Sequence, residues 1–298
     1  MIEIIGRALA PSAILAATRF AGEFKRLDAD TGGYMKERTI RLYAGPDGAG
    51  IIEATNHVAL ASITGFVAEA GLDRVLEFKA ADLASMAASA FASDPGETFE
   101  IRSDPAEPSV VTLETPNGSG GRVAVTGPTM PLAETVAASI YGAGGSLKLK
   151  HEPAYRYCLP GDYLRKLLAE IRSIIAPPGE NHPRFSVLLF YRRPGGAAAA
   201  LAVRDGFLVP RVDLTTGDIR GWPGSSEVAL DLREIEPMIA YAVAHDAAFV
   251  VIDAYEDAPA SIRVLDLGPE TGTATFYLAP IASAHTYVAN LFDPEAAQ

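Results

Sequence analysis

A strand, a helix and about three further strands recur four times along this chain of 298 residues. In the first unit, an apolar stretch over residues 2–9 precedes a helix that Pro11 and Ser12 open. Apolar residues then follow the spacing of three and four that places them on one helix face, which predicts a helix reaching Leu27. Strands are expected over 38–43, 50–54 and 57–63, with a turn at 45–48. The inward positions of the helix are Ala13, Ala17, Phe20, Phe24 and Leu27.

The other three units repeat this order. Helices are expected over about 80–92 and 163–175 and within 232–244, each after a short apolar strand. Pro237 fits the last helix only if that helix begins just before it. The remaining strands are expected over 75–78, 98–101, 110–114, 122–125, 154–159, 185–191, 198–203, 206–212, 228–230, 249–253, 262–267 and 274–278.

Four βαβββ units predict an α+β protein whose helices gather on one face of antiparallel sheets. One unit cannot bury its helix alone, so we expect the units to pair into two similar domains, over 1–130 and 151–281. Residues 131–150 are rich in glycine, lack a sustained period and are interpreted as the connection between the domains. A C-terminal tail covers 282–298.

The charge of the chain limits its partners. A net charge of −12 at pH 7 makes the surface as a whole repel nucleic acid, so contact with DNA requires locally gathered Lys and Arg. The single cysteine, Cys158, cannot form an internal disulfide, which fits a reducing cytoplasm. The N-terminus lacks the pattern of an export signal, and no run approaches the about 18 apolar residues of a membrane span. We therefore expect a soluble cytoplasmic protein without membrane contact.

No pattern in the sequence is typical of catalysis, and we expect neither an enzyme nor a metal or other cofactor. The five histidines lack the spacing of a metal site, and Cys158 has no near partner that marks a nucleophile. The stretch Gly142-Ala-Gly-Gly145 is followed by Ser-Leu-Lys rather than the Gly-Lys-Ser/Thr of a phosphate-binding loop. Asp253, Glu256 and Asp257 cluster in what is interpreted as a solvated hairpin end.

Three short stretches carry a resemblance to a known family: Ala54-Thr-Asn-His-Val-Ala-Leu60, Leu159-Pro-Gly-Asp-Tyr163 and Phe276-Tyr-Leu-Ala-Pro280. The first resembles a strand segment that ends in a His-Val pair in DNA polymerase sliding clamps such as proliferating cell nuclear antigen (PCNA). The second resembles the strand-to-helix step that opens their second domain, and the third is similar to their final strand. Bacterial β sliding clamps share this architecture with three domains per chain.

The resemblance implies a DNA-clamp fold and a homotrimeric ring of six domains, with helices lining the hole and antiparallel sheets outside. Such a ring encircles double-stranded DNA without sequence preference and is a processivity factor for DNA replication. It tethers DNA polymerase and other replication or repair proteins, which bind, like the clamp loader, through hydrophobic peptide motifs. The protein would work at the nucleoid or replication site. Neighbouring subunits would meet head to tail, the first domain of one against the second of the next.

Basic residues on the predicted helices are the candidate DNA contacts. On the first helix and again on the third, two arginines lie seven residues apart and share a stripe, with a lysine nearby. Such side chains would meet phosphates in a salt-sensitive way that does not depend on sequence. An ordinary solvated helix face of mixed charge explains the same residues. The second helix offers mainly one lysine at its start, so a weakly basic hole is expected. The residues are Arg19, Lys25, Arg26, Lys79, Arg165, Lys166 and Arg172.

The resemblance also implies an outer hydrophobic pocket, beside the connection and the last strand, that takes an apolar side chain of a partner peptide. His57 is alternatively a polar residue at a strand end, and Tyr277 and Leu278 are alternatively plain core. The tail contains Tyr287-Val-Ala-Asn-Leu-Phe292, which is either a competitor for such a pocket or an extra element packed outside. The positions that match the pocket are His57, Tyr277, Leu278, Ala279 and Pro280.

One alternative function stays open. A clamp-like scaffold for protein interactions, which does not encircle DNA or works only in a hetero-oligomer, would have the same repeat and a similar composition. Stimulation of a polymerase that depends on DNA separates the two functions, because a scaffold gives none.

Overall fold

The computed structural model describes residues 2–27, 34–45, 48–55, 59–94, 96–126, 155–174, 186–192, 198–204, 207–208, 212–214, 228–254, 260–265 and 274–278. The chain divides into two compact units. Unit 1 comprises residues 1–150 with 270–275, and unit 2 comprises 151–269 with 276–298, so the last strand, over 274–278, begins in unit 1 and ends in unit 2. The predicted domain limits at 130 and 281 lie outside the described residues and stay predictions.

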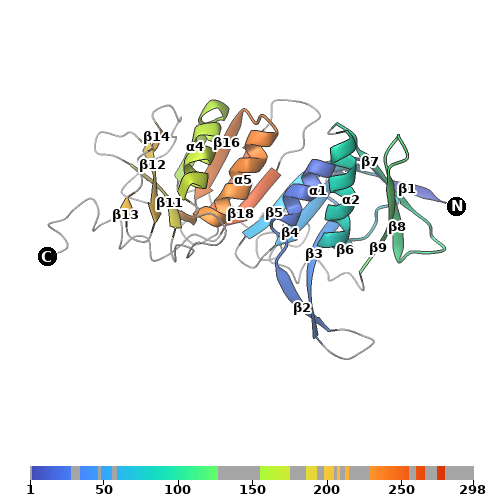
Figure 1. Ribbon diagram of the computed structural model, residues 1–298. Coiled ribbons are helices and arrows are strands. Elements are labelled where there is room, and N and C mark those ends of the chain that lie inside the picture. Colours follow the sequence, from blue (N-terminus) through green and yellow to red (C-terminus); the bar gives the residue numbers. More distant parts are fainter. Residues whose placement is uncertain are drawn as a thin grey trace, which may run out of the picture. The chain divides into compact units, whose positions relative to one another are not determined.

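Unit 1 contains two strand–helix repeats, and the first has four strands after its helix where three were predicted. Its elements are β1 (Glu3–Leu9), α1 (Pro11–Thr18), β2 (Glu23–Leu27), β3 (Tyr34–Ala44), β4 (Ala49–Thr55), β5 (Ala59–Ala68), β6 (Leu76–Lys79), α2 (Ala80–Ser93), β7 (Phe99–Ser103), β8 (Val110–Glu114) and β9 (Gly120–Ala124). The strands pair antiparallel in the order β5-β1-β7-β8-β9, and β3 pairs with β2, β4 and β6 while β4 also pairs with β5. The two helices lie side by side against the strands (Figure 1).

Unit 2 contains the other two repeats. Its elements are β10 (Tyr155–Pro160), α4 (Gly161–Ile174), β11 (Ser186–Arg192), β12 (Ala198–Arg204), β13 (Phe207–Leu208), β14 (Val212–Leu214), β15 (Val228–Asp231), α5 (Leu232–Ala244), β16 (Phe249–Ala254), β17 (Ala260–Leu265) and β18 (Ala274–Leu278). The strands follow the orders β10-β16-β17-β18 and β13-β12-β11-β15, and β14 pairs with β12. The helices α4 and α5 again lie side by side (Figure 1).

The first helix is shorter than predicted. At its end the hydroxyl of Thr18 donates to the carbonyl of Leu15 at 2.7 Å. The next three N–H groups bond back by three residues, which tightens the chain, and Gly22 then donates to the carbonyl of Thr55 on β4 at 2.8 Å. Residues 23–27 pair with β3 as strand β2. The predicted helical extension is therefore wrong, because pairing with a neighbouring strand overrides a spacing that also suits a helix.

Two other predicted helices differ in detail. In α2 the side chains of Leu83, Ala87 and Ala90 are buried, and Phe91, at the border of this stripe, is 39% exposed. In α5 the proline lies well inside the helix, because the helix begins at Leu232 rather than next to Pro237. No helix in the described ranges has both the length and the apolar character that crossing a membrane requires.

Phe66 on β5 occupies space that two glycines leave open. A Cβ at Gly50, the register partner of Phe66 on β4, would lie 2.3 Å from the ring carbon Cδ2. A Cβ at Gly6 on β1 would lie 3.1 Å from the same carbon. The ring, which is 6% exposed, therefore packs directly on the backbone of β4 and β1.

The step from β10 into α4 requires glycine. The N–H of Gly161 donates to the carbonyl of Ala248 at 2.9 Å, and a Cβ at this position would lie only 2.5 Å from the carbonyl oxygen of Ala247. Both alanines belong to the segment that leads from α5 into β16. Gly161 thus lets two strand–helix junctions of unit 2 touch, which gives a structural reason for the Leu159-Pro-Gly-Asp stretch.

Candidate nucleic-acid interface

The helix α4 has one buried face and one charged face. Leu164, Leu167, Leu168 and Ile171 follow helical spacing and are all buried. The opposite face is exposed and carries Arg165, Lys166 and Arg172, together with Asp162 and Glu170. Three of the predicted basic residues therefore lie together on one exposed helix face.

Both arginines of α4 are paired with carboxylates from the other helix segment of unit 2. Arg165 Nη2 lies 2.6 Å from Asp246 Oδ1, just beyond the end of α5, and Arg172 Nε lies 2.7 Å from Glu236 Oε1 near its start. The two helices consequently run antiparallel. Lys166 has no ion pair with any residue that the structure describes. Sequence reasoning missed both carboxylates because they are 81 and 64 residues away from their arginines.

The helices of unit 1 carry less positive charge than predicted. Arg19 is the exposed residue that follows α1, whereas Lys25 and Arg26 lie on strand β2. The predicted stripe of Arg19 and Arg26 on one helix is therefore wrong, because the helix ends before either residue. Lys79 is the N-cap residue of α2, and Asp82 brings an acidic group to the first turn of that helix.

A cavity of about 300 Å³ lies where the start of α4 meets the end of α5. Pro160, Leu164 and Phe249 give it an apolar part, and the ion pair between Arg165 and Asp246 gives it a charged part. The backbone of Asp246 is left-handed, with φ of 47°, a conformation that aspartate tolerates better than most residues. No sequence motif marks this cavity, because it forms from two junctions far apart in the chain.

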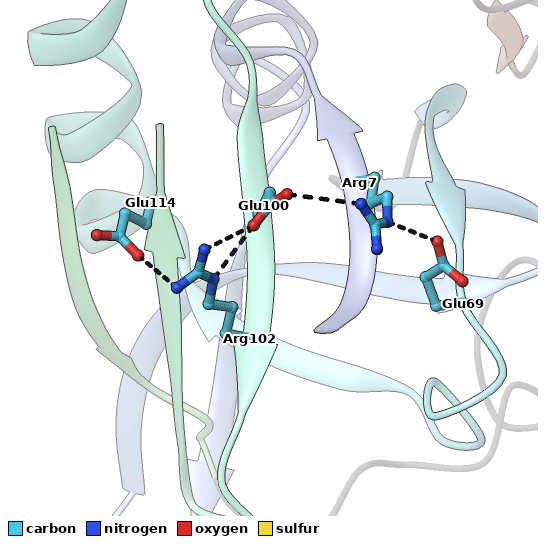
Figure 2. A network of polar contacts seen from close by, with 5 residues as sticks. All are labelled: Arg7, Glu69, Glu100, Arg102 and Glu114. Atoms are coloured by element: carbon cyan, nitrogen blue, oxygen red, sulfur yellow. Dashed lines mark hydrogen bonds and ion pairs between the residues drawn. The ribbon is translucent and has the colours of Figure 1, made fainter. Parts of the chain in front are cut away.

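A second charged surface lies on the strands of unit 1 (Figure 2). Arg7 lies 2.8 Å from Glu69 and 3.7 Å from Glu100, and Arg102 lies 2.8 Å from Glu100 and 2.9 Å from Glu114. The hydrogen bond to Glu100 raises the pKa of Arg102 above its ordinary value. With three carboxylates for two guanidinium groups, this surface is net negative and a poor match for the phosphates of nucleic acid.

A buried polar cluster lies within unit 1. Arg41 is 3.5 Å from Glu53 and 2.9 Å from Glu77, and the hydroxyl of Tyr43 donates to Glu53 at 3.1 Å. Burial raises the pKa of Glu53, and this effect is opposed by Arg41 and by the hydrogen bond from Tyr43. No group of three or more His, Cys, Asp or Glu side chains in the described residues is arranged to hold a metal ion.

Comparison with solved structures identifies the fold, although no protein-family model and no curated protein sequence matches the chain. A PCNA2–PCNA3 complex from Sulfolobus tokodaii gives a TM-score of 0.61 at 15% identity, covering 95% of this chain and 100% of that one. PCNA from Entamoeba histolytica gives a TM-score of 0.58 at 11% identity, covering 93% and 97%. The chain has the PCNA clamp fold.

The clamp fold confirms the predicted α+β class with antiparallel sheets and repeated strand–helix units. It also confirms the clamp fold that the resemblance of the three short stretches to PCNA implied.

The predicted partner pocket of the clamp fold falls mostly outside the described side chains. His57, Ala279 and Pro280 lie outside the described residues. Leu278 is the last residue of β18, and its side chain is not among those that the structure describes. Tyr277 is described and is 3% exposed, next to the fully buried Phe276. This burial is what the alternative interpretation of Tyr277 as core predicts, and the pocket itself stays a prediction.

Proposed function

We propose that the chain is a subunit of a DNA sliding clamp, a ring that encircles duplex DNA and tethers a DNA polymerase. The observation that carries the proposal is the two-unit clamp fold over nearly the whole chain. In each unit a pair of helices lies side by side against antiparallel strands (Figure 1). A ring of such units would place a continuous set of helices along the enclosed DNA.

The proposed DNA contacts centre on α4. Arg165, Lys166 and Arg172 are exposed on one face of this helix, and long basic side chains there can meet phosphates without reading bases. Arg19 and Lys79 at the ends of α1 and α2 would add isolated contacts from unit 1. Lys25 and Arg26 are no longer part of a helical surface, because they lie on β2.

The proposed ring is a homotrimer of the clamp type, because two clamp units per chain require three chains for a ring of six. One matched structure is a complex of PCNA2 with PCNA3, so a ring of different chains is the alternative closure. Light scattering after size exclusion decides between them. A mass of about 94 kDa, three times the 31.4 kDa of the chain, supports the homotrimer. A monomer at every concentration would overturn it.

Encirclement has its own experiment. The protein is loaded onto nicked circular DNA and onto a linear duplex of equal length, and retention is measured after gel filtration in high salt. A ring stays on circular DNA and slides off free ends, so we expect retention on the circle alone. Equal retention on both templates, or loss from both, would contradict encirclement.

Binding of polymerase and clamp loader is proposed to use the outer pocket. His57→Ala and Ala279→Arg should then weaken polymerase stimulation while leaving retention on circular DNA unchanged. Unchanged stimulation in both variants would move the partner site elsewhere on the ring.

A clamp-like scaffold is the second candidate function, and one observation favours it. The arginines of α4 are already paired with carboxylates, and α2 brings an acidic residue rather than further basic ones to its first turn. Such a helix surface attracts DNA weakly. Polymerase stimulation on primed circular DNA discriminates between the two, because a scaffold that does not encircle DNA gives none.

A further inference from the structure

Two carboxylates lie against the basic residues of the proposed DNA surface. Asp246 and Glu236 pair with Arg165 and Arg172 at 2.6 and 2.7 Å, distances typical of charge-assisted hydrogen bonds. Both arginines are otherwise exposed, at 62% and 56% of their side chains. Each guanidinium group thus presents itself to solvent together with a neutralising negative charge.

The two pairs differ in strength. Asp246 is 79% exposed, so water and salt screen its attraction for Arg165. Glu236 is only 18% exposed, and a partly buried pair is screened less. The carboxylate at 236 is therefore expected to withhold its arginine from a phosphate more effectively than the one at 246.

The position of Asp246 adds a second observation. Its left-handed φ of 47° immediately after α5 suits glycine or asparagine best. Aspartate here accepts the same backbone and also places a carboxylate on Arg165. Asparagine at 246 would keep the backbone and remove only the charge, which makes the pair testable without distortion.

We propose that Asp246 and Glu236 limit the strength with which α4 holds duplex DNA, by neutralising Arg165 and Arg172. This inference rests on the proposed clamp function and deepens it. A phosphate must displace the carboxylate or share the guanidinium group with it, and the arginine then releases fewer counterions from DNA. Lys166, which has no ion pair within the described part of the chain, supplies the direct contact. A weak contact of this kind suits a ring that slides.

The experiment compares two variants of equal net charge. Asp246→Asn with Glu236→Gln removes the two pairing carboxylates. Asp162→Asn with Glu170→Gln removes two charges on α4 that take part in no ion pair in the described residues. Binding to a fluorescent 30-base-pair duplex is followed by anisotropy from about 50 to 200 mM KCl, the range over which phosphate contacts change affinity strongly.

We expect the first variant to bind about tenfold more tightly than wild type at low salt, and the slope of log affinity against log salt to steepen by about 1 to 2. The matched variant should change affinity less than the first variant and keep the slope, because Asp162 and Glu170 share the exposed face of α4 but pair with no guanidinium group that the structure describes. Equal changes in both variants, or no change in the first, would overturn the inference. Glu236 is partly buried, so its replacement can disturb folding, and each single variant is therefore also measured. A folded Asp246→Asn protein is enough to decide whether Asp246 limits the contact of Arg165 with DNA.

Retention on circular DNA keeps the two proposals apart. If wild type is not retained on circles while the first variant still binds duplex more tightly than its matched control, encirclement fails and the inference stands. If wild type is retained and the two variants bind alike, the inference fails alone.

Discussion

Arg41 on β3 lies directly opposite Glu53 on β4 in the sheet register, with Nη1 3.5 Å from Oε1. On its other side the same residue is the register partner of Glu77 on β6, with Nε 2.9 Å from Oε2. One guanidinium group therefore serves two carboxylates that are 1% and 8% exposed as residues. Two buried carboxylates thus share one guanidinium group, and we expect this arrangement to affect how unit 1 responds to pH and to substitution.

The pKa of Glu53 gives the first prediction. Burial raises this pKa above the ordinary value of 4.5, so the native state binds more protons than the unfolded state between the two pKa values. The contribution of Glu53 to stability is therefore fully present below the unfolded pKa and is lost as pH rises through the folded one. Glutamine at position 53 cannot titrate, so the Glu53→Gln variant serves as the reference. The free energy of unfolding of wild type minus that of the variant should decrease as pH rises between the two pKa values, by about 1.4 kcal/mol per pH unit. Urea unfolding at pH 4 to 8 measures this difference, and a difference that increases with pH would contradict a raised pKa of Glu53.

Removal of the shared cation gives the second prediction. Arg41→Met removes the guanidinium group that two buried carboxylates share and should lower the free energy of unfolding by about 3–5 kcal/mol. Arg102→Met is the matched control, because Arg102 also lies between two carboxylates but in an exposed network (Figure 2). Its unfolding midpoint should equal that of wild type within error. Similar losses of unfolding free energy in Arg41→Met and Arg102→Met would show that burial does not determine how much removal of the arginine destabilises the protein.

The junction at Gly161 gives the third prediction. Gly161→Ala places a Cβ 2.5 Å from the backbone carbonyl of Ala247, so the two junctions must separate. We expect a loss of about 1–3 kcal/mol, as for other overpacked sites. Gly96→Ala is the control, because its nearest contact is the side chain of Asp94 at 3.5 Å, and it should change stability by less than about 0.5 kcal/mol. Thermal unfolding of both variants makes the comparison, and a neutral Gly161→Ala would mean that the junction can relax.

The basic face of α4 gives the fourth prediction. Replacing Arg165, Lys166 and Arg172 by alanine should weaken duplex binding and flatten its salt dependence by about 0.9 for each phosphate that the variant no longer neutralises. Lys166→Ala alone should account for more than a third of the effect, because both arginines are already paired. Anisotropy titrations measure both quantities. Unchanged binding in the triple variant would exclude α4 as a helix that faces DNA.

Local signals in the sequence predicted most of the fold. Glycine correctly predicted the turn over 45–48. Gly48 has a φ of 80°, and its N–H donates to the carbonyl of Gly45 at 3.0 Å, as the expected turn requires. Phe24 and Leu27 misled the prediction of the first helix, because their spacing suits a helix while pairing with β3 places them on a strand. Nothing in a local window reports such pairing.

The candidate site was less predictable than the fold. Arg165, Lys166 and Arg172 could be found because one helix face collects residues spaced by one turn or two. Asp246 and Glu236 could not, because helix packing brings them to α4 from far along the chain. A sequence therefore shows where basic side chains gather, but their effective charge depends on partners that only the tertiary structure supplies.

The packing of Phe66 on Gly6 and Gly50 has a consequence for how this chain can diverge. Gly50 cannot gain even a methyl group while the ring is in place, because Cδ2 would lie 2.3 Å from the new carbon. At Gly6 a methyl group requires small shifts of the Phe66 ring, at 3.1 Å, and of the Ile101 side chain, at 2.8 Å. A smaller residue at 66 must therefore precede a larger one at 50, and it leaves a cavity until that second change occurs. Descendants with a bulkier residue at 50 should carry a smaller one at 66.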